Sequence, residues 1–383
     1  MSRPAPGPGA ASKPAPDEPE LGDLGDAADP GDDAGSGDDN GPVHAFSLPP
    51  GADPAIDWGV RAHLHPDGSP RIIERHLVVP PELAGLRLDH FVKTQIPRLS
   101  RTRIQGIIAG QLRRADGHAP KPATIVAAGD HFILRRAAQP EPPCPRTFGV
   151  VIRDPRLYVV DKPAGLPVHA SAKFYFNTLT RVLGERFPDE PELQICHRLD
   201  RETSGCLVVA RDRAAAAVIK DAFATKRRVR KQYLAVVHGQ PPWDDEHTID
   251  LALRVAQPGD PTRLTHVRML AGPGGLPAIT RVRVERRTAA YALVRCTLVT
   301  GRQHQIRAHL AAAGYPIVGD KLYAHGDDAF LRYCNDGLVP ELARLFVLPR
   351  HALHAAAVSF PHPDGGTVTA EAPLPADLAG LLA

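Results

Sequence analysis

The sequence has few of the features that would place it outside the cell or in a membrane. Its 383 residues include five cysteines, and no two of them have CxxC spacing (Cys144, Cys196, Cys206, Cys296 and Cys334). An odd number at such wide spacing argues against a disulfide framework or a zinc site, so we expect reduced thiols. The chain has no run of 18 apolar residues, and its N-terminus lacks the apolar core of a signal peptide. We therefore expect a cytoplasmic protein that contacts no membrane.

Signatures of bound cofactors are also missing. The sequence contains no GxGxxG fingerprint, no P-loop and no H-E-x-x-H motif. His304, His309, His351 and His354 lie close in sequence but have no cysteine partner, so structural roles are expected for them. We expect no metal site and no small-molecule cofactor.

Charge is distributed unevenly along the chain. Residues 1–40 carry ten acidic and two basic side chains, whereas the remainder holds 44 Lys and Arg against 33 Asp and Glu. A basic body of this kind fits a polyanionic partner, although charge alone does not name one. The first 45 residues are mostly Pro, Gly, Ala and Asp and cannot bury enough apolar surface to fold. We expect residues 1–72 to be a disordered, Pro/Gly-rich tail.

The most informative stretch is HRLDRETSG, residues 197–205. Asp200 lies between Arg198 and Arg201, just before the apolar run 206–210, which reads as a buried strand. Neighbouring guanidinium groups favour an ionised carboxylate, which suits a nucleophile or an electrostatic partner better than a general acid. A surface Arg–Asp–Arg cluster that caps a turn is the alternative interpretation of these residues alone.

HRLDRETSG resembles the signature of the RluA-type pseudouridine synthases, which isomerise uridine in structured RNA. In that family the aspartate of this element is catalytic, and Asp200 matches it. Further elements follow in family order: DKPAGLPVH at 161–169, KQYLA at 231–235 and TGRQHQIRAH at 300–309. The resemblance implies catalytic roles for Asp200, Tyr233 and Arg307, with Arg302 as the second candidate for the cation that pairs with Asp200. Substrate RNA contacts are implied for the following side chains: Arg198, His197, Arg302, Thr203 and Lys162.

Each of these blocks also has a plainer interpretation. Asp161 and Lys162 can pair to hold a Lys-Pro turn, and Tyr233 can be an ordinary strand aromatic. Arg302 and Arg307 can be a solvated helix face. The basic run 226–231 offers phosphate contacts, although charge runs are more often solvated.

The pattern of residues 147–383 predicts an α+β catalytic domain with the pseudouridine synthase fold, a mostly antiparallel mixed sheet flanked by helices. Strands are expected over 157–161, 205–210, 232–238, 278–286, 291–299, 354–360 and 367–371. Helices are expected over 176–187, 213–225, 302–313 and 338–346. The Pro/Gly/Asp-rich segment 240–275 has no predicted role.

Residues 73–136 resemble an S-four-like RNA-binding domain, a small α+β unit. Strands are expected over 75–80, 112–114 and 128–134, and helices over 87–96 and 101–109, the second with Ser100 as its N-cap. The resemblance implies RNA contacts for Arg101, Arg103 and Arg113; the alternative is that these arginines are merely solvated. Residues 137–146 are a Pro-rich, semi-rigid linker.

Uridine isomerisation breaks the bond from ribose C1′ to N1, turns the uracil and rejoins it through C5, so the reaction involves no net redox change. One carboxylate and a retained base favour isomerisation over glycoside hydrolysis, which needs two carboxylates.

The pairing of an S-four-like domain with this catalytic domain resembles that of family members acting on large-subunit ribosomal RNA, and we expect a monomer. The alternatives are a catalytically silent RNA-binding or ribosome-assembly protein, a synthase acting on transfer RNA, and a deaminase, whose zinc ligands are missing here.

Overall fold

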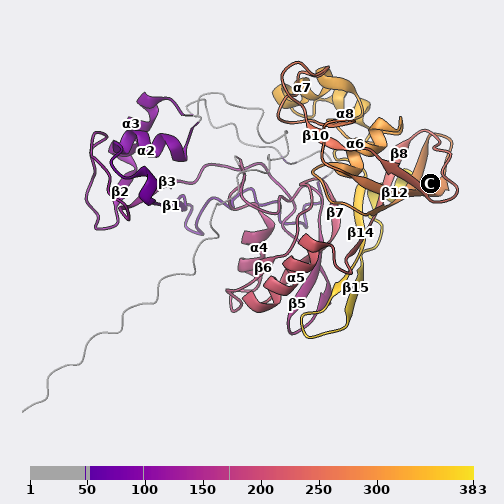
Figure 1. Ribbon diagram of the computed structural model, residues 1–383, viewed down its shortest axis with the longest axis horizontal. Helices are drawn as coiled ribbons and strands as arrows, with labels where there is room; N and C mark the ends of the chain where they lie inside the picture. Colours follow the sequence, from indigo (N-terminus) through magenta and orange to yellow (C-terminus); the bar gives the residue numbers. More distant parts are fainter. Residues whose placement is uncertain (1–47, 49–51, 98, 172) are drawn as a thin grey trace, which may run out of the picture. The chain divides into compact units, whose positions relative to one another are not determined.

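The computed structural model describes residues 48, 52–97, 99–171 and 173–383 (Figure 1). It contains two compact units, Gly59–Pro143 and Cys144–Ala383, the second joined by residues 52–58. The tail expected over residues 1–72 lies mostly outside the described residues. Residues 52–71 form turns and an isolated bridge from Leu64 to Pro70. None of the helices in the described part of the chain has the length and apolar character needed to cross a bilayer.

The smaller unit combines a three-stranded antiparallel sheet with two helices. The sheet order is β1-β3-β2. The elements are β1 (Ile72–Val78), the single turn η1 (Pro81–Leu83), α2 (Leu88–Gln95), α3 (Arg101–Gly110), β2 (Leu112–Arg114) and β3 (His131–Ala137). The Ser100 hydroxyl accepts a hydrogen bond from the Arg103 amide at 3.3 Å, which confirms the predicted N-cap. Leu88, Phe91, Ile104 and Ile108 pack in one core between the helices and the sheet.

The larger unit is built on a ten-stranded sheet of order β4-β5-β7-β14-β8-β13-β12-β9, with β15 on β14 and β6 on β7. Its strands are β4 (Gly149–Arg153), β5 (Leu157–Lys162), β6 (Gln194–Ile195), β7 (Ser204–Ala210), β8 (Arg230–His238), β9 (His247–Asp250), β12 (Ile279–Arg287), β13 (Tyr291–Leu298), β14 (Leu353–Pro361) and β15 (Thr367–Glu371). Only the β14–β7 pair among these is parallel. The predicted α+β fold with a mostly antiparallel mixed sheet is confirmed.

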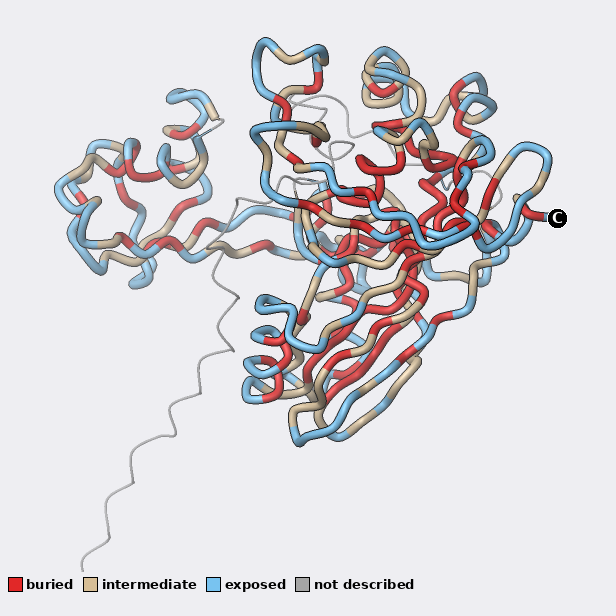
Figure 2. Tube along the Cα trace, turned by 45° about the vertical axis from the view of Figure 1, so that its right-hand side comes forward, coloured by how far each residue is buried: buried red, intermediate tan, exposed pale blue. Residues whose placement is uncertain are grey.

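Helices cover both faces of this sheet, in keeping with the central strand β7, which is buried along its whole length. The helices are α4 (Leu179–Arg186), α5 (Arg213–Thr225), α6 (Gln305–Ala312), α7 (Gly326–Asp336), α8 (Pro340–Phe346) and α9 (Ala376–Gly380). In β5, Leu157 and Val159 pack on the α5 side, whereas Tyr158 and Val160 belong to the core on the other face. The buried residues follow these central strands in Figure 2.

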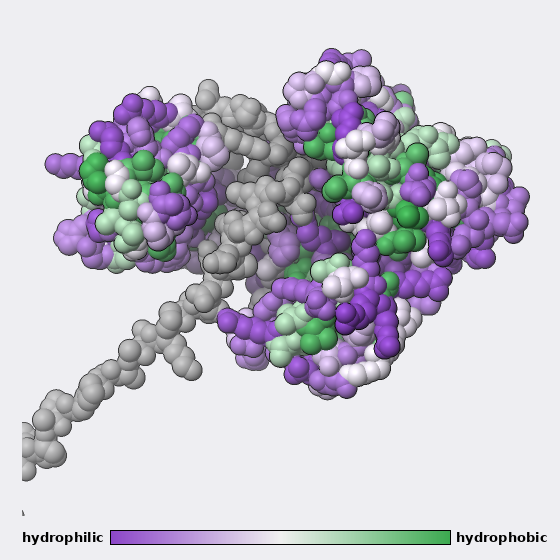
Figure 3. Space-filling view, viewed as in Figure 1, coloured by the Kyte–Doolittle hydropathy of each residue, from purple (hydrophilic) through white to green (hydrophobic). Residues whose placement is uncertain are grey.

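The surface gives no single apolar face. On the side shown in Figure 3, hydrophobic side chains lie in small separate groups among hydrophilic ones. The large exposed hydrophobic residues are spread along the sequence, from Leu48 to Val347.

The segment 240–275 is more ordered than its composition suggested. It forms β9 and a two-stranded hairpin, β10 (Leu253–Val255) with β11 (Met269–Ala271), which packs against α6. The sequence analysis did not predict this hairpin, nor α7. The helix expected over 302–313 begins at Gln305 because His304 before it has a positive φ of 50°.

Candidate active site

The loop 197–203 joins β6 to β7, and Asp200 lies on it. The loop turns tightly: the Thr203 amide donates to the Asp200 carbonyl at 3.0 Å, and β7 begins at the next residue. Gly205 has a φ of 109°, and a Cβ there would overlap the backbone of Ala355 in β14. Only glycine therefore allows β7 and β14 to approach this closely, which anchors the loop at the centre of the sheet.

Asp200 forms an ion pair with Arg307 on α6. Arg307 Nη1 donates to Asp200 Oδ2 at 3.0 Å, with 4% of the arginine side chain and 28% of the aspartate side chain exposed. Arg302, the second candidate, instead donates from Nε to the Pro277 carbonyl at 3.1 Å. The structure thus pairs Asp200 with Arg307 and not with Arg302.

Arg307 is itself held by a second carboxylate, that of Asp320. The Nε and Nη2 atoms of Arg307 donate to the two Asp320 oxygens at 2.7 and 3.0 Å. Asp320 is fully buried and also accepts the Leu322 and Tyr323 amides at 3.0 and 3.1 Å. This bidentate contact fixes the guanidinium plane and leaves Nη1 to face Asp200. The sequence analysis did not assign Asp320 a role; an aspartate between Gly319 and Lys321, just after the run 315–318, was the available signal.

The surrounding charges keep Asp200 ionised. Burial alone would raise the pKa of Asp200, but electrostatic attraction to His304 and Arg307, together with the Arg307 hydrogen bond, lowers it below its usual value. Burial likewise opposes the charge on Asp320, and Arg307 overcomes it, so the Asp320 pKa is also lowered. The site therefore holds two carboxylate anions around one arginine.

Tyr233 lies in β8 and its side chain is near this carboxylate. It is 7% exposed, and burial, followed by the negative charge of Asp200, raises its pKa. Its hydroxyl makes no hydrogen bond with any residue that the structure describes. The phenol is therefore protonated at neutral pH and available as a donor or as a stacking surface.

Three residues expected to contact the substrate have internal partners instead. The Lys162 ammonium is fully buried and donates to the carbonyls of Pro163, Leu166 and Arg201 at 2.8, 2.9 and 3.0 Å. Burial lowers the Lys162 pKa to about 7. An RNA contact would require removing these three bonds, so Lys162 instead ties the DKPAG turn to the loop that carries Asp200.

His197 and Thr203 are the other two. The His197 ring stacks on Phe223 with centroids 4.7 Å apart, and its Nε2 accepts the Val208 amide at 3.1 Å. Burial lowers the His197 pKa to about 3, so this ring is neutral. Thr203 is 2% exposed and its hydroxyl bonds to His351 Nε2 at 2.8 Å. Both side chains shape the loop from within, which corrects the expectation that they face RNA.

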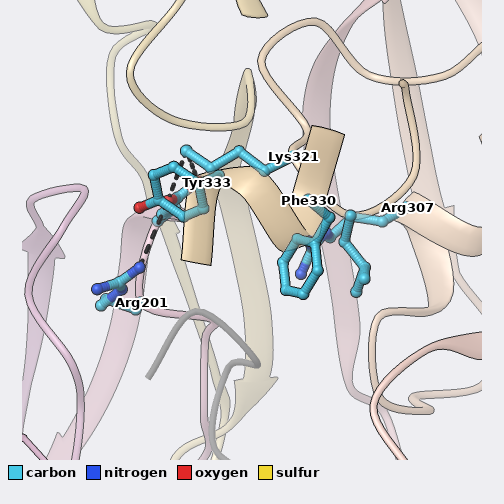
Figure 4. Close-up of a pocket in the computed structure, with 7 residues that line it drawn as sticks. Arg201, Arg307, Lys321, Phe330 and Tyr333 are labelled. Atoms are coloured by element: carbon cyan, nitrogen blue, oxygen red, sulfur yellow. Dashed lines mark hydrogen bonds and ion pairs between the residues drawn. The ribbon is translucent and has the colours of Figure 1, made fainter. Parts of the chain in front are cut away.

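A small polar pocket adjoins the Asp200–Arg307 pair, lined by Arg201, Glu202, Arg307, Lys321, Leu322, Phe330 and Tyr333. Lys321 Nζ donates to both Glu202 oxygens, at 2.7 and 2.9 Å. Figure 4 shows Lys321 beside the Tyr333 ring, while Phe330 lies next to Arg307. Both Glu202 oxygens are therefore occupied by the Lys321 ammonium, and this carboxylate is not free to act as an acid or a base.

Comparisons with known proteins agree with this geometry. The family model described as "RNA pseudouridylate synthase" matches residues 156–312. The chain is 34% identical, over 80% of its length and 80% of the relative, to ribosomal large subunit pseudouridine synthase D of Neisseria meningitidis serogroup A. The chain belongs to the RNA pseudouridylate synthase family.

Another relative of this pseudouridine synthase is the ribosomal large subunit pseudouridine synthase C of Escherichia coli, 34% identical over 76% of the chain and 90% of the relative. Among solved structures, human RNA pseudouridylate synthase domain containing 1 is similar, at 28% identity and a TM-score of 0.47. That similarity covers 60% of this chain and 84% of that chain. The range matched by the family model contains Asp200, Tyr233 and Arg307 but ends before Asp320.

In the smaller unit of this synthase, the arginines expected to contact RNA differ in their surroundings. Arg103 is exposed. Arg101 is 64% exposed and lies 3.4 Å from the Asp89 carboxylate, and Arg113 donates to the Leu112 carbonyl at 2.7 Å.

Among the described residues, no group of three or more His, Cys, Asp or Glu side chains could hold a metal ion.

Proposed function

We propose that this protein isomerises specific uridines of large-subunit ribosomal RNA to pseudouridine, with Asp200 as the catalytic carboxylate. The observation that carries the proposal is the partly exposed, ionised Asp200 held at 3.0 Å by a buried Arg307 in a chain of this family. The substrate class is supported by the relatives, which are named as ribosomal large subunit pseudouridine synthases.

In the proposed reaction, the Asp200 anion acts at ribose C1′ of an extruded uridine while the C1′–N1 bond breaks. The uracil stays in the site and turns, a C1′–C5 bond forms, and the proton lost from C5 is balanced by one gained at N1. In this proposal Tyr233 stacks on the extruded base, and its raised pKa suits a hydrogen-bond donor better than a base. Arg307 keeps Asp200 ionised and oriented.

The arrangement favours isomerisation over hydrolysis. Glycosidases use a second carboxylate, either to activate water or to protonate the leaving group. Here the nearby carboxylates are engaged: Asp320 by Arg307 and Glu202 by Lys321. Asp200 alone is left to act on the substrate.

RNA binding by the smaller unit is part of the proposal. We assign residues 73–136 as the S-four-like RNA-binding domain, followed by linker 137–146 and catalytic domain 147–383, after a tail over 1–72. Arg101 and Arg103 are exposed and suited to phosphate contacts, as is Arg198 beside the catalytic aspartate. The protein would act as a cytoplasmic monomer without a cofactor.

The test is tritium release from RNA labelled at uracil C5. Bulk unmodified ribosomal and transfer RNA are compared with wild type, Asp200→Asn and the control Asp244→Asn, an exposed carboxylate on the surface. We expect release from ribosomal RNA by wild type and control but not by Asp200→Asn. Tritium release from transfer RNA alone would show that transfer RNA, and not ribosomal RNA, is the substrate. Tight RNA binding without any tritium release would show that the protein binds RNA but does not isomerise uridine.

A further inference from the structure

The segment Lys226–Lys231 runs from the C-cap of α5 into the start of β8. It carries five cations, of which Lys226, Arg227, Arg228 and Arg230 are exposed and Lys231 is half-buried. None of these side chains forms a hydrogen bond or an ion pair with a residue that the structure describes. Several other surface arginines of the larger unit have carboxylate partners, such as Arg254 with Asp260 at 2.6 Å. We call this segment the cationic turn.

The backbone of the cationic turn is strained in a way that its side chains do not explain. Lys226 and Arg228 have φ values of 56° and 55°, and they are two of the five non-glycine residues with positive φ in the described chain. Glycine or asparagine is the usual choice at such positions, particularly at the C-cap of a helix, where Lys226 lies. Two charged residues therefore occupy positions where glycine or asparagine would be more stable, and backbone strain of this kind is common at functional sites.

The helix dipole of α5 accounts for only part of this charge. A cation near a helix C-terminus is favourable, but the effect is limited to the last turn. Lys226 and Arg227 satisfy that condition, whereas Arg230 and Lys231 lie in β8. The remaining cations need another partner.

The cationic turn borders the catalytic loop. Lys231 Nζ lies 5.9 Å from the Phe223 ring centroid, and that ring stacks on His197 of the loop. A Cβ on Gly301 would come within 3.3 Å of the same ammonium, so Lys231 also lies beside the residue that precedes Arg302. Along β8, Lys231 is two residues from Tyr233, about 7 Å at the usual rise of a strand.

From these contacts we infer that the cationic turn binds the RNA phosphates that flank the uridine entering the Asp200 site. The inference rests on the proposed function and extends it: the turn contacts the backbone and not the bases, so it adds affinity without sequence preference. Phosphate contacts replace the carboxylate partners that these side chains lack, and they release counterions from the RNA.

The test is the salt dependence of RNA binding by the full chain. A transcript of large-subunit ribosomal RNA is titrated with wild type and with the triple variant Arg227→Gln, Arg228→Gln, Arg230→Gln. The control replaces Arg281, Arg283 and Arg287 with Gln, arginines that pair with Glu246, Glu285 and Asp244 and give the same charge change. In the turn variant, we expect the slope of log K against log salt to fall by about 3, close to 1 for each of the three arginines removed.

A binding measurement separates this inference from the proposed function. If wild type released no tritium but the salt slope of the turn variant were still smaller, RNA binding by the cationic turn would be supported and the proposed isomerase activity would be refuted. Equal slopes in wild type and turn variant, or equal losses in turn variant and control, would overturn the inference.

A single substitution gives an independent reading. Arg228→Gly relieves the positive φ and is expected to raise the urea midpoint of unfolding while weakening RNA binding several-fold. A higher midpoint with unchanged RNA affinity would show that the turn is only a solvated surface, and the inference would fail. Arg228→Asn, which tolerates the same backbone conformation, should behave in the same way.

Discussion

A buried aspartate holds arginine side chains in each of the two units, and the surroundings of the arginines differ. In the smaller unit, the fully buried Asp89 carboxylate contacts Arg87 at 2.9 Å and Arg101 at 3.4 Å, and these arginines are 39% and 64% exposed. In the larger unit, Asp320 holds Arg307, which is 4% exposed. The first arrangement presents its arginines to solvent, whereas the second turns its arginine toward one other carboxylate.

The comparison shows that exposure, more than the ion pair itself, sets what an oriented arginine can do. Attraction between charges is strong where water is excluded and weak where it is not. Arg307 can therefore change the ionisation of Asp200, while Arg101 can only supply a screened positive charge to a phosphate. Each prediction below perturbs one side of this comparison and uses the other side as a reference.

The largest effect is expected from Asp320→Ala. Arg307 would keep only Asp200 as a carboxylate partner, and removing one partner of a buried ion pair costs about 3–5 kcal/mol of unfolding free energy. Asp89→Ala leaves arginines that solvent can hydrate, so it should cost less. Urea unfolding of the two variants gives the comparison; equal losses would show that burial of the arginine does not matter.

Arg307→Lys should come next. An ammonium cannot donate in one plane to both Asp200 and Asp320, so the orientation of the catalytic carboxylate is lost. We expect kcat for tritium release to fall about 100-fold with little change in KM, the pattern of a lost transition-state interaction. The reference is Arg101→Lys, which keeps a solvated charge and should keep full activity. A change confined to KM in the Arg307 variant would contradict the assigned role.

Acid sensitivity tests the same carboxylates. The pKa values of Asp89 and Asp320 are both lowered in the folded protein, Asp89 mainly by its hydrogen bond to Arg87, and Asp320 by Arg307 against the effect of burial. Such groups stabilise the fold above their unfolded pKa, about 3.9 for aspartate, and this stabilisation is lost as the pH falls through the folded value. Wild type should therefore lose stability below about pH 4 more steeply than Asp320→Asn. Urea midpoints between neutral pH and acid would show it, and parallel curves would refute it.

The smallest effect is expected from Arg101→Gln. Losing one exposed phosphate contact should reduce the salt slope of RNA binding by about 1 and leave stability within about 0.5 kcal/mol of wild type. Arg135→Gln, an exposed arginine paired with Glu74 in the same unit, is the control. If the control variant lost as much slope, the contact would not be specific to the α3 side.

Sequence reasoning was most successful where the chemistry is local. The HRLD and TGRxHQIR elements predicted the pairing of Asp200 with Arg307, which the structure shows, and the apolar run 206–210 predicted the strand that follows Asp200. The catalytic roles of Asp200, Tyr233 and Arg307 stay predictions. Strand and helix patterns of the central sheet were confirmed, and α5 begins and ends at the expected residues. These features depend on residues near one another in the chain.

The features that the sequence did not predict depend on which way a side chain points and on partners far away in the chain. The letters DKPAG do not say whether Lys162 points outward or into three carbonyls, and only the structure shows that it points inward. Asp320 lies 13 residues beyond Arg307, and no spacing rule links the two. The hairpin β10–β11 was missed because its strands have three residues each and depend on packing against α6.

The parallel pairing of β7 with β14 also affects how the protein is made. The catalytic loop is tied to residues about 150 positions later, through Ser204 with His354 and Thr203 with His351. On a growing chain, Asp200 emerges long before the strand that supports its loop. Contacts of such wide sequence separation form late and slowly in folding. The nascent enzyme should therefore stay inactive until β14 has been synthesised, so that no truncated fragment ending before it modifies RNA.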